Sequence, residues 1–228
     1  MNPTKRVLLI DDEPQGNSLE KIANGVKERL VFESKQIEVL DKDYLDGQAN
    51  LVPEKIYQAI DEAMKVTHYD LILVDYSYGQ DGIDGLDVIK HIRVRHQKDE
   101  VFLYSANQKE IIRKVVGDDF KKSSSEDIVN GINELMNFRI AKIVSRPMMD
   151  SVVVGFLKQD ASFSPYGFIV NMLREHPDKM FLSCYPKLSG KTYGEIADLL
   201  DEGGNGMANE WLSAILEQLV VYLSEVNE

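Results

Sequence analysis

The sequence predicts an α/β protein built on a parallel β-sheet. Three apolar runs of strand length, Val7–Ile10, Leu71–Val74 and Val101–Tyr104, each stop abruptly at a carboxylate or a hydroxyl. Buried parallel strands have this continuous apolar character. In the N-terminal half, strand-like and helix-like segments also alternate, as they do in a sheet wrapped by helices. With 228 residues and 43% apolar content, the chain has room for one large domain or two small ones.

The elements of the N-terminal part are placed by their apolar spacing and by the residues at their ends. The expected order begins with a strand at 7–10, a helix over 19–30, a weaker strand at 36–40 and a helix after Pro53. A strand at 69–74, a helix after the glycine-rich loop 79–85 and a strand at 100–104 follow. The order ends with a helix that Gly117 ends, a short fifth strand around Phe120, and a long helix from Ser125 whose apolar positions run to Ile143. Five strands and five helices fit into this stretch.

Arg146-Pro147 breaks the last of these helices, because proline disrupts a helix interior. Beyond it the pattern changes to helices without convincing strands. Thr192 and Glu195 have the spacing of a capping box, and an apolar face runs along Leu212–Leu223. The sequence therefore predicts a domain over residues 1–145 and a small, mainly helical domain over 146–228.

Charge and composition narrow the classes of partner. The net charge is −12, and the part from Arg146 to the end carries six Lys/Arg against twelve Asp/Glu. Because nucleic-acid binding draws much of its affinity from cationic side chains, this part is poorly suited to DNA. No apolar stretch approaches the roughly 20 residues that span a bilayer, and Cys184 is the single cysteine, so no intramolecular disulfide forms. We expect a cytoplasmic protein with no membrane contact.

Polar side chains gather where three of the predicted strands end. Asp11 and Asp12 follow the first strand, Asp75 follows the third, and Ser105 follows the fourth. The carboxyl ends of parallel strands line the crevice in which ligands bind, so these side chains should converge. Clustered carboxylates repel one another, and an all-oxygen site of this kind suits Mg²⁺. With the metal present, one carboxylate can attack a phosphoryl group.

In this order the motifs resemble the receiver domain of two-component response regulators, over about residues 1–145. The matching segments are Leu9–Pro14, Leu73–Asp75, Asp84–Leu86, Tyr104–Ala106, and Gly117–Phe120 followed by lysine. The resemblance implies a flavodoxin-like fold with a five-stranded parallel sheet. It implies Asp75 as the phosphoacceptor, and Asp11, Asp12, Asp75 and the Ser77 carbonyl as Mg²⁺ ligands. Ser105 would be the switch hydroxyl and Phe120 the aromatic residue that follows it.

The phosphate-pairing lysine of the resemblance is assigned to Lys122, with Lys121 as the alternative because Phe120 lies close to both. Two features of the sequence depart from the family pattern. Gly79 replaces the usual proline of the loop after the phosphoacceptor, and Ser123 follows Lys122 where the family normally has proline. The fifth strand is therefore expected to be divergent.

The resulting hypothesis is a response regulator that a histidine kinase or a phosphotransfer protein phosphorylates at Asp75. It would be a signalling protein and not an enzyme, although a receiver assists its own phosphoryl transfer and dephosphorylation. The helical domain would bind a protein target or form a homodimer. Two alternatives stay open: a DNA-binding regulator with an atypical helix-turn-helix near Thr192–Leu200, and a receiver-fold scaffold that works without phosphorylation.

Overall fold

A computed structural model describes residues 2–80, 82–97, 99–117, 124–159, 165–182, 185–201, 206, 210–215 and 217–218. The chain divides into two compact units by its internal contacts. The first comprises residues 1–64, 69–94 and 99–163, and the second comprises residues 65–68, 95–98 and 164–228. The first unit thus includes residues 146–159, which the expected boundary at 145 leaves in the helical region.

The first unit is built on a five-stranded, wholly parallel sheet. Its strands are β1 (Thr4–Asp11), β2 (Val31–Glu38), β3 (Leu71–Asp75), β4 (Val101–Ser105) and β5 (Lys142–Ser145). They lie in the order β2-β1-β3-β4-β5. This is the order of flavodoxin-like doubly wound sheets, so the predicted fold class is confirmed. β2 begins five residues earlier than expected, because this edge strand is largely exposed and lacks a continuous apolar run.

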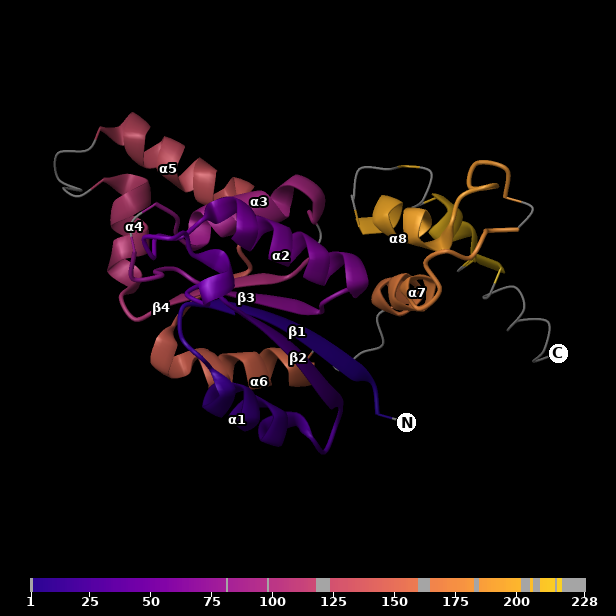
Figure 1. Ribbon diagram of the computed structural model, residues 1–228, viewed down its shortest axis with the longest axis horizontal. Helices are drawn as coiled ribbons and strands as arrows, with labels where there is room; N and C mark the ends of the chain where they lie inside the picture. Colours follow the sequence, from indigo (N-terminus) through magenta and orange to yellow (C-terminus); the bar gives the residue numbers. More distant parts are fainter. Residues whose placement is uncertain are drawn as a thin grey trace. The chain divides into compact units, whose positions relative to one another are not determined.

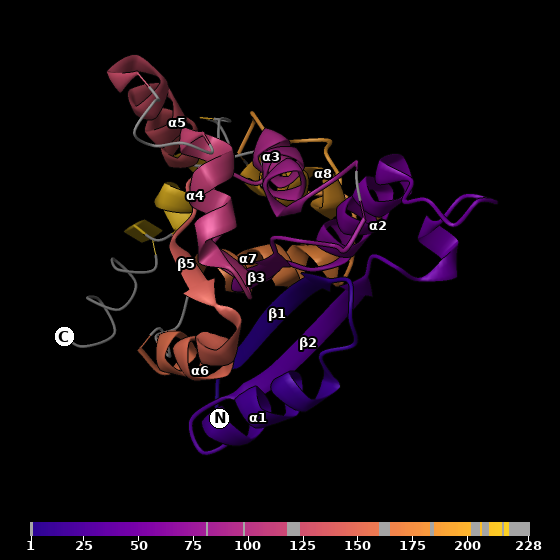
Figure 2. The same ribbon diagram turned by 90° about the vertical axis from the view of Figure 1, so that its left-hand side faces the viewer.

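The helices of the first unit cover both faces of the sheet (Figures 1 and 2). One face carries α1 (Gly16–Val26) and α6 (Met149–Gln159), and the other carries α2 (Pro53–Val66), α3 (Gly85–Arg95), α4 (Gln108–Val116) and α5 (Ser125–Asn137). Side chains alternate between the two faces along each strand. In β3, Leu71 and Leu73 pack on the α1 side, whereas Ile72 and Val74 pack on the other side.

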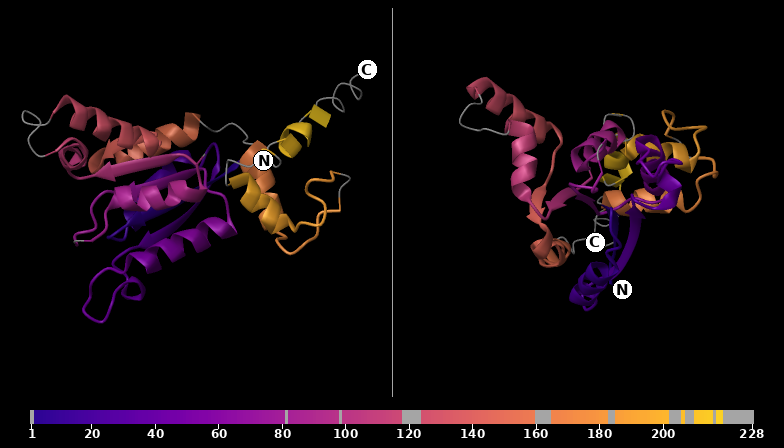
Figure 3. Two further views of the ribbon diagram at one scale, coloured as in Figure 1. Left: turned by 90° about the horizontal axis from the view of Figure 1, so that it is seen from above. Right: turned by 60° about the vertical axis from the view of Figure 1, so that its left-hand side comes forward.

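The fifth strand of the sheet lies later in the chain than the predicted position around Phe120. β4 pairs instead with Lys142–Ser145, in a register that joins Phe102 to Lys142 and Ser105 to Ser145. α4 and α5 follow each other within the connection from β4 to β5, as Figures 2 and 3 show. Residues 118–123, which include Phe120, Lys121 and Lys122, lie outside the described residues.

The long helix expected from Ser125 to Ile143 is also shorter than predicted. Ser124 caps it through a capping box with Asp127, and the helix ends at Asn137. Arg139 then adopts a positive φ of 48°, which a continuing helix does not allow. Ile140 and Ile143 continue the helical spacing by coincidence, since Ile143 belongs to β5. Apolar periodicity alone could not separate the two elements.

α6 is the second helix on the α1 face and completes the sheet's cover there. It follows β5 after a short 3₁₀ turn, Arg146–Met148, with Pro147 in its first turn. Met149, Val153 and Leu157 are buried in the same core as Ile22 and Val26 of α1. Arg146-Pro147 therefore ends a strand and does not break a helix.

The second unit contains α7 (Pro165–Arg174) and α8 (Tyr193–Asp201). The predicted capping box is confirmed, because the Thr192 hydroxyl accepts from the Glu195 N–H while the Glu195 carboxylate accepts from the Thr192 N–H. The core of the second unit is formed by Val170, Leu173, Phe181, Leu188, Ile196, Ala197, Leu200 and Trp211. Within this unit, Arg174 pairs with the buried Asp201, which also accepts a hydrogen bond from Tyr166. Among the described residues, none of the helices has the length and apolar character needed to cross a bilayer.

Candidate functional site

The carboxyl ends of four strands bring the site together. Asp11 is the last residue of β1, Asp75 of β3 and Ser105 of β4, while Arg146 directly follows β5. The strand register aligns them, with Ile10 beside Val74, Asp75 beside Tyr104 and Ser105 beside Ser145. The convergence expected from the sequence is present for the three acids Asp11, Asp12 and Asp75.

Three carboxylates form the centre of this site. Asp11, Asp12 and Asp75 each offer one oxygen, and these three oxygens lie within 4.8 Å of one another. Asp11 and Asp75 are buried, with 0% and 1% of their surface exposed. Carboxylates held this close and this far from water disfavour their own ionisation unless a cation compensates them.

Burial raises the pKa of Asp75 to about 7; Arg146 opposes this rise, while the charges of Asp11 and Asp12 add to it. The pKa of Asp12 is likewise raised to about 6. Burial is the largest cause, and the hydrogen bond with Asp11 and the charge of Asp11 raise the pKa further. Carboxyl pKa values raised by burial and by neighbouring charges make Asp75 and Asp12 candidates for a functional site.

Among the residues that the structure describes, Arg146 is the cation that faces all three acids, and the sequence reasoning missed it. Its Nη2 donates to Asp75 Oδ2 and lies 3.8 Å from Asp11 Oδ1 and 3.9 Å from Asp12 Oδ1. Its Nη1 donates to Glu13 Oε2 at 3.2 Å. The sequence did carry a signal, because the pattern of the resemblance is lysine followed by proline, and Arg146-Pro147 is a basic residue followed by proline after the observed fifth strand.

The residues present fit a divalent cation. Asp12 Oδ1 is a buried oxygen that accepts no hydrogen bond from any described residue, although it is within ion-pair distance of Arg146. Together with one oxygen each of Asp11 and Asp75, it gives the hard oxygen donors that Mg²⁺ prefers. Ser77, whose carbonyl the resemblance adds to this set, lies two residues beyond the end of β3 and is exposed.

The loop after β3 is held close to Asp75. A Cβ on Gly85 would lie 2.3 Å from the Asp75 carbonyl oxygen, so only glycine fits there. The Gly85 N–H donates to the Tyr76 carbonyl at 2.9 Å. Asp84 caps α3 by accepting from the Leu86 and Asp87 N–H groups, and Lys114 of α4 pairs with it. The Asp84-Gly85 motif thus shapes the wall beside the acid cluster.

Ser105 is 3% exposed at the end of β4, and its hydroxyl accepts a hydrogen bond from the Asn107 N–H at 3.0 Å. Beside it, the Tyr104 hydroxyl donates to Asp11 Oδ2. Tyr104 is a second site residue that the sequence reasoning missed, because it looked like one more apolar residue of a buried strand. The other predicted residues, Phe120, Lys121 and Lys122, lie outside the described part of the chain.

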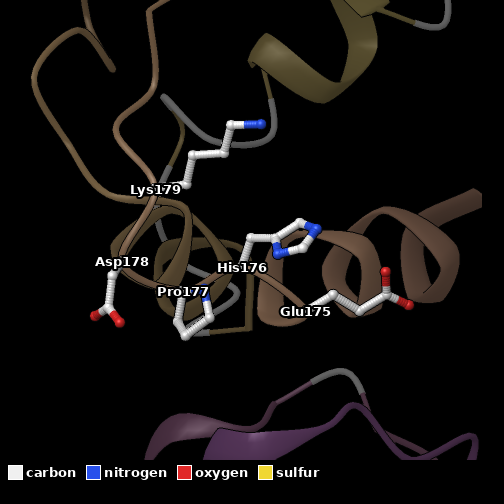
Figure 4. A pocket seen from close by; sticks show the side chains of 5 residues that line it. All are labelled: Glu175, His176, Pro177, Asp178 and Lys179. Carbon is white, nitrogen blue, oxygen red and sulfur yellow. The ribbon is translucent and has the colours of Figure 1, made fainter.

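A cavity of about 370 Å³ in the second unit is lined by Glu175, His176, Pro177, Asp178 and Lys179. Figure 4 shows that these side chains point in different directions. Polar groups that bind one small ligand have to converge on it. The acid cluster of the first unit is therefore the better candidate site.

No family model and no curated protein matches the sequence. Among solved structures, a sensor protein from Polaromonas sp. JS666 is 14% identical, with a TM-score of 0.42 over 69% of this chain and 95% of that one. A response regulator, TrrA from Thermotoga maritima in complex with Mg²⁺-BeF, is 19% identical, with a TM-score of 0.39 over 68% of this chain and 97% of that one.

A third similar structure is the signal receiver domain of an HD domain-containing protein from Pseudomonas fluorescens Pf-5, which is 14% identical with a TM-score of 0.40, over 70% of this chain and 94% of that one. The class of this protein rests on its own strand order, β2-β1-β3-β4-β5, and on the acids at the strand ends. These define a receiver-like fold followed by further helices.

Proposed function

We propose that this chain is a Mg²⁺-dependent response regulator that accepts a phosphoryl group on Asp75. The observation that carries the proposal is the cluster of Asp11, Asp12 and Asp75 at the ends of β1 and β3, with Arg146 facing all three. A histidine kinase or a phosphotransfer protein would supply the phosphoryl group. The second unit would then transmit the signal to a protein target or to a second copy of the chain.

In the phosphoryl transfer, a carboxylate oxygen of Asp75 attacks the phosphorus of a phosphohistidine. The new bond is an acyl phosphate P–O bond, the P–N bond to the donor breaks, and the histidine nitrogen keeps the electron pair and takes up a proton. Asp75 must be ionised to attack, and a pKa of about 7 leaves a large fraction of it protonated at neutral pH. Mg²⁺ held by Asp11, Asp12, Asp75 and the Ser77 carbonyl would favour the ionised form and neutralise charge on the phosphoryl oxygens.

Arg146 is the residue we assign to the phosphoryl oxygens, in the role that the sequence gave to Lys122. Its guanidinium already donates to Asp75 Oδ2. After transfer, the N–H groups of the guanidinium can donate to two oxygens of the phosphoryl group at once. A lysine ammonium, in contrast, would act on these oxygens as a point charge. Ser105 would supply a hydroxyl hydrogen bond from the end of β4.

Incubation with an acyl-phosphate donor tests the proposal by intact mass. We expect one phosphoryl group per chain, with Mg²⁺ present and not after its chelation. Asp75→Asn should not be labelled, whereas Asp84→Asn, a matched change of an acid that caps α3, should still be labelled. No labelling of the wild type, or equal labelling of Asp75→Asn, would favour the phosphorylation-independent scaffold.

A further inference from the structure

Arg146 faces the same three carboxylates that would hold a metal ion. Its Nη2 donates to Asp75 Oδ2 and lies 3.8 Å from Asp11 Oδ1 and 3.9 Å from Asp12 Oδ1. One nitrogen of the guanidinium is therefore in contact or ion-pair distance of each acid of the cluster. The guanidinium already compensates part of the negative charge that would attract Mg²⁺.

Two cations on these carboxylates repel each other. Mg²⁺ binds carboxylate oxygens at about 2.0–2.1 Å, so an ion held by the three acids would lie beside the guanidinium if Arg146 kept its position. Asp11 and Asp75 are buried, and charges that are shielded from water are only weakly screened. Metal binding therefore has to weaken the contacts of Arg146 with the acids.

The Arg146 side chain can give way to a metal ion. It is 29% exposed, and its Nη1 pairs at 3.2 Å with Glu13, whose side chain is 67% exposed. The guanidinium can therefore move towards Glu13 and solvent without crossing the core. Its Nε is a buried donor that has no hydrogen-bond partner among the described residues, so its position among the acids is not fully satisfied.

We propose that Arg146 competes with Mg²⁺ for the three acids and so sets the affinity of the site for the metal. The inference rests on the Mg²⁺-dependent function proposed above, and it adds a role that is separate from the contact of Arg146 with the phosphoryl oxygens. The same positive charge weakens metal binding and favours phosphoryl transfer. Its removal should therefore tighten metal binding and slow labelling by an acyl-phosphate donor.

Titration calorimetry with MgCl₂ at constant ionic strength tests the competition, at pH 9 so that protons compete less for the carboxylates. Arg146→Met removes the charge and keeps an unbranched apolar stem. We expect its dissociation constant for Mg²⁺ to be about tenfold lower than that of the wild type, or lower still. Arg146→Gln, a second neutral variant, should show the same fall. Arg146→Lys keeps the charge and should lie between the neutral variants and the wild type.

Arg6→Met is the matched control, because it removes the same charge near the other end of β1. Arg6 pairs with Glu33 of β2. It precedes Asp11 by about 16 Å of extended strand. Its dissociation constant for Mg²⁺ should equal that of the wild type. Thermal unfolding by circular dichroism shows that each variant is folded, and MgCl₂ should raise the Tm of Arg146→Met more than that of the wild type.

The outcomes separate this inference from the function on which it rests. If the wild type binds Mg²⁺ and the folded neutral variants bind it equally or more weakly, the competition is refuted while the metal-dependent function stands. If none of the proteins binds Mg²⁺, the proposed metal site is wrong and the competition falls with it. Tighter binding that Arg6→Met shows to the same extent would refute the specific role of Arg146.

Discussion

Asp75→Asn should stabilise the protein, and the gain should grow with pH. The carboxyl of Asp75 is buried and has a pKa of about 7 in the fold, against its ordinary value of 3.8. The folded state therefore holds a proton that the unfolded state releases between these two values. The burial of this carboxyl does not lower the free energy of unfolding below pH 3.8. Between pH 3.8 and pH 7 the loss of unfolding free energy grows with pH, and above pH 7 it is constant. Asparagine is neutral at every pH and avoids this cost.

The size of the effect follows from the two pKa values. One pKa unit corresponds to about 1.4 kcal/mol, so a difference from 3.8 to about 7 corresponds to at most about 4 kcal/mol above pH 7. At pH 5 the same relation gives about 1.5 kcal/mol. Asp75→Asn should thus gain close to 3 kcal/mol relative to the wild type between pH 5 and pH 8.

Urea denaturation of both proteins at pH 5, 6, 7 and 8, without divalent cations, measures this difference. The raised pKa of Asp12 gives a slope to both proteins, so the comparison isolates Asp75. Added Mg²⁺ should narrow the gap, since it stabilises the intact carboxylate cluster more than the variant. A stability difference that is flat with pH, or a variant that is less stable than the wild type at pH 8, would refute this electrostatic reasoning.

Three further changes test other parts of the structure. Arg146→Ala should slow labelling by an acyl-phosphate donor at least about tenfold, since it removes the cation beside Asp75, and Arg146→Lys should restore part of the rate; equal rates would contradict the role. Gly85→Ala should cost about 2 kcal/mol or more in urea denaturation, because its Cβ meets the Asp75 carbonyl, whereas Gly155→Ala in α6 has free space and should be neutral or stabilising. Ser124→Ala should cost about 1 kcal/mol by losing the capping box of α5, and no measurable cost would contradict the cap.

The parts of the fold that sequence could predict are those with a strong local signal. β3 and β4 are buried at every position, so their apolar runs stand out and place Asp75 and Ser105 at the correct edge. Asp11 and Asp12 follow from β1 in the same way. The acid cluster was therefore predictable from strand ends and the chemistry of carboxylates.

The fifth strand was not predictable from its own four residues. β5 is an edge strand with two exposed positions, and Lys142–Ser145 carries no apolar run. The helical spacing of Ile140 and Ile143 with α5 concealed the end of that helix at Asn137. What identifies β5 is its pairing with β4, which is a tertiary contact. Because the fifth strand was expected around Phe120, the sequence pointed to Lys121 and Lys122 and gave no role to Arg146, which follows the observed β5.

Tyr104 was hidden for a different reason. A tyrosine in a buried strand reads as core, and its ring is indeed packed in the core. Its hydroxyl reaches Asp11 only because β4 and β1 lie on either side of β3 in the folded sheet. The spacing of Tyr104 and Asp11 in the sequence does not reveal this contact.

The most direct test of the central claim is to locate the phosphoryl group on the chain. After incubation with an acyl-phosphate donor and Mg²⁺, borohydride reduces the acyl phosphate, and mass spectrometry of the digested protein identifies the reduced residue. We expect reduction at Asp75 alone, abolished when Mg²⁺ is chelated. Reduction at another carboxylate, or no reduced residue at all, would contradict the assignment of Asp75 as the phosphoacceptor.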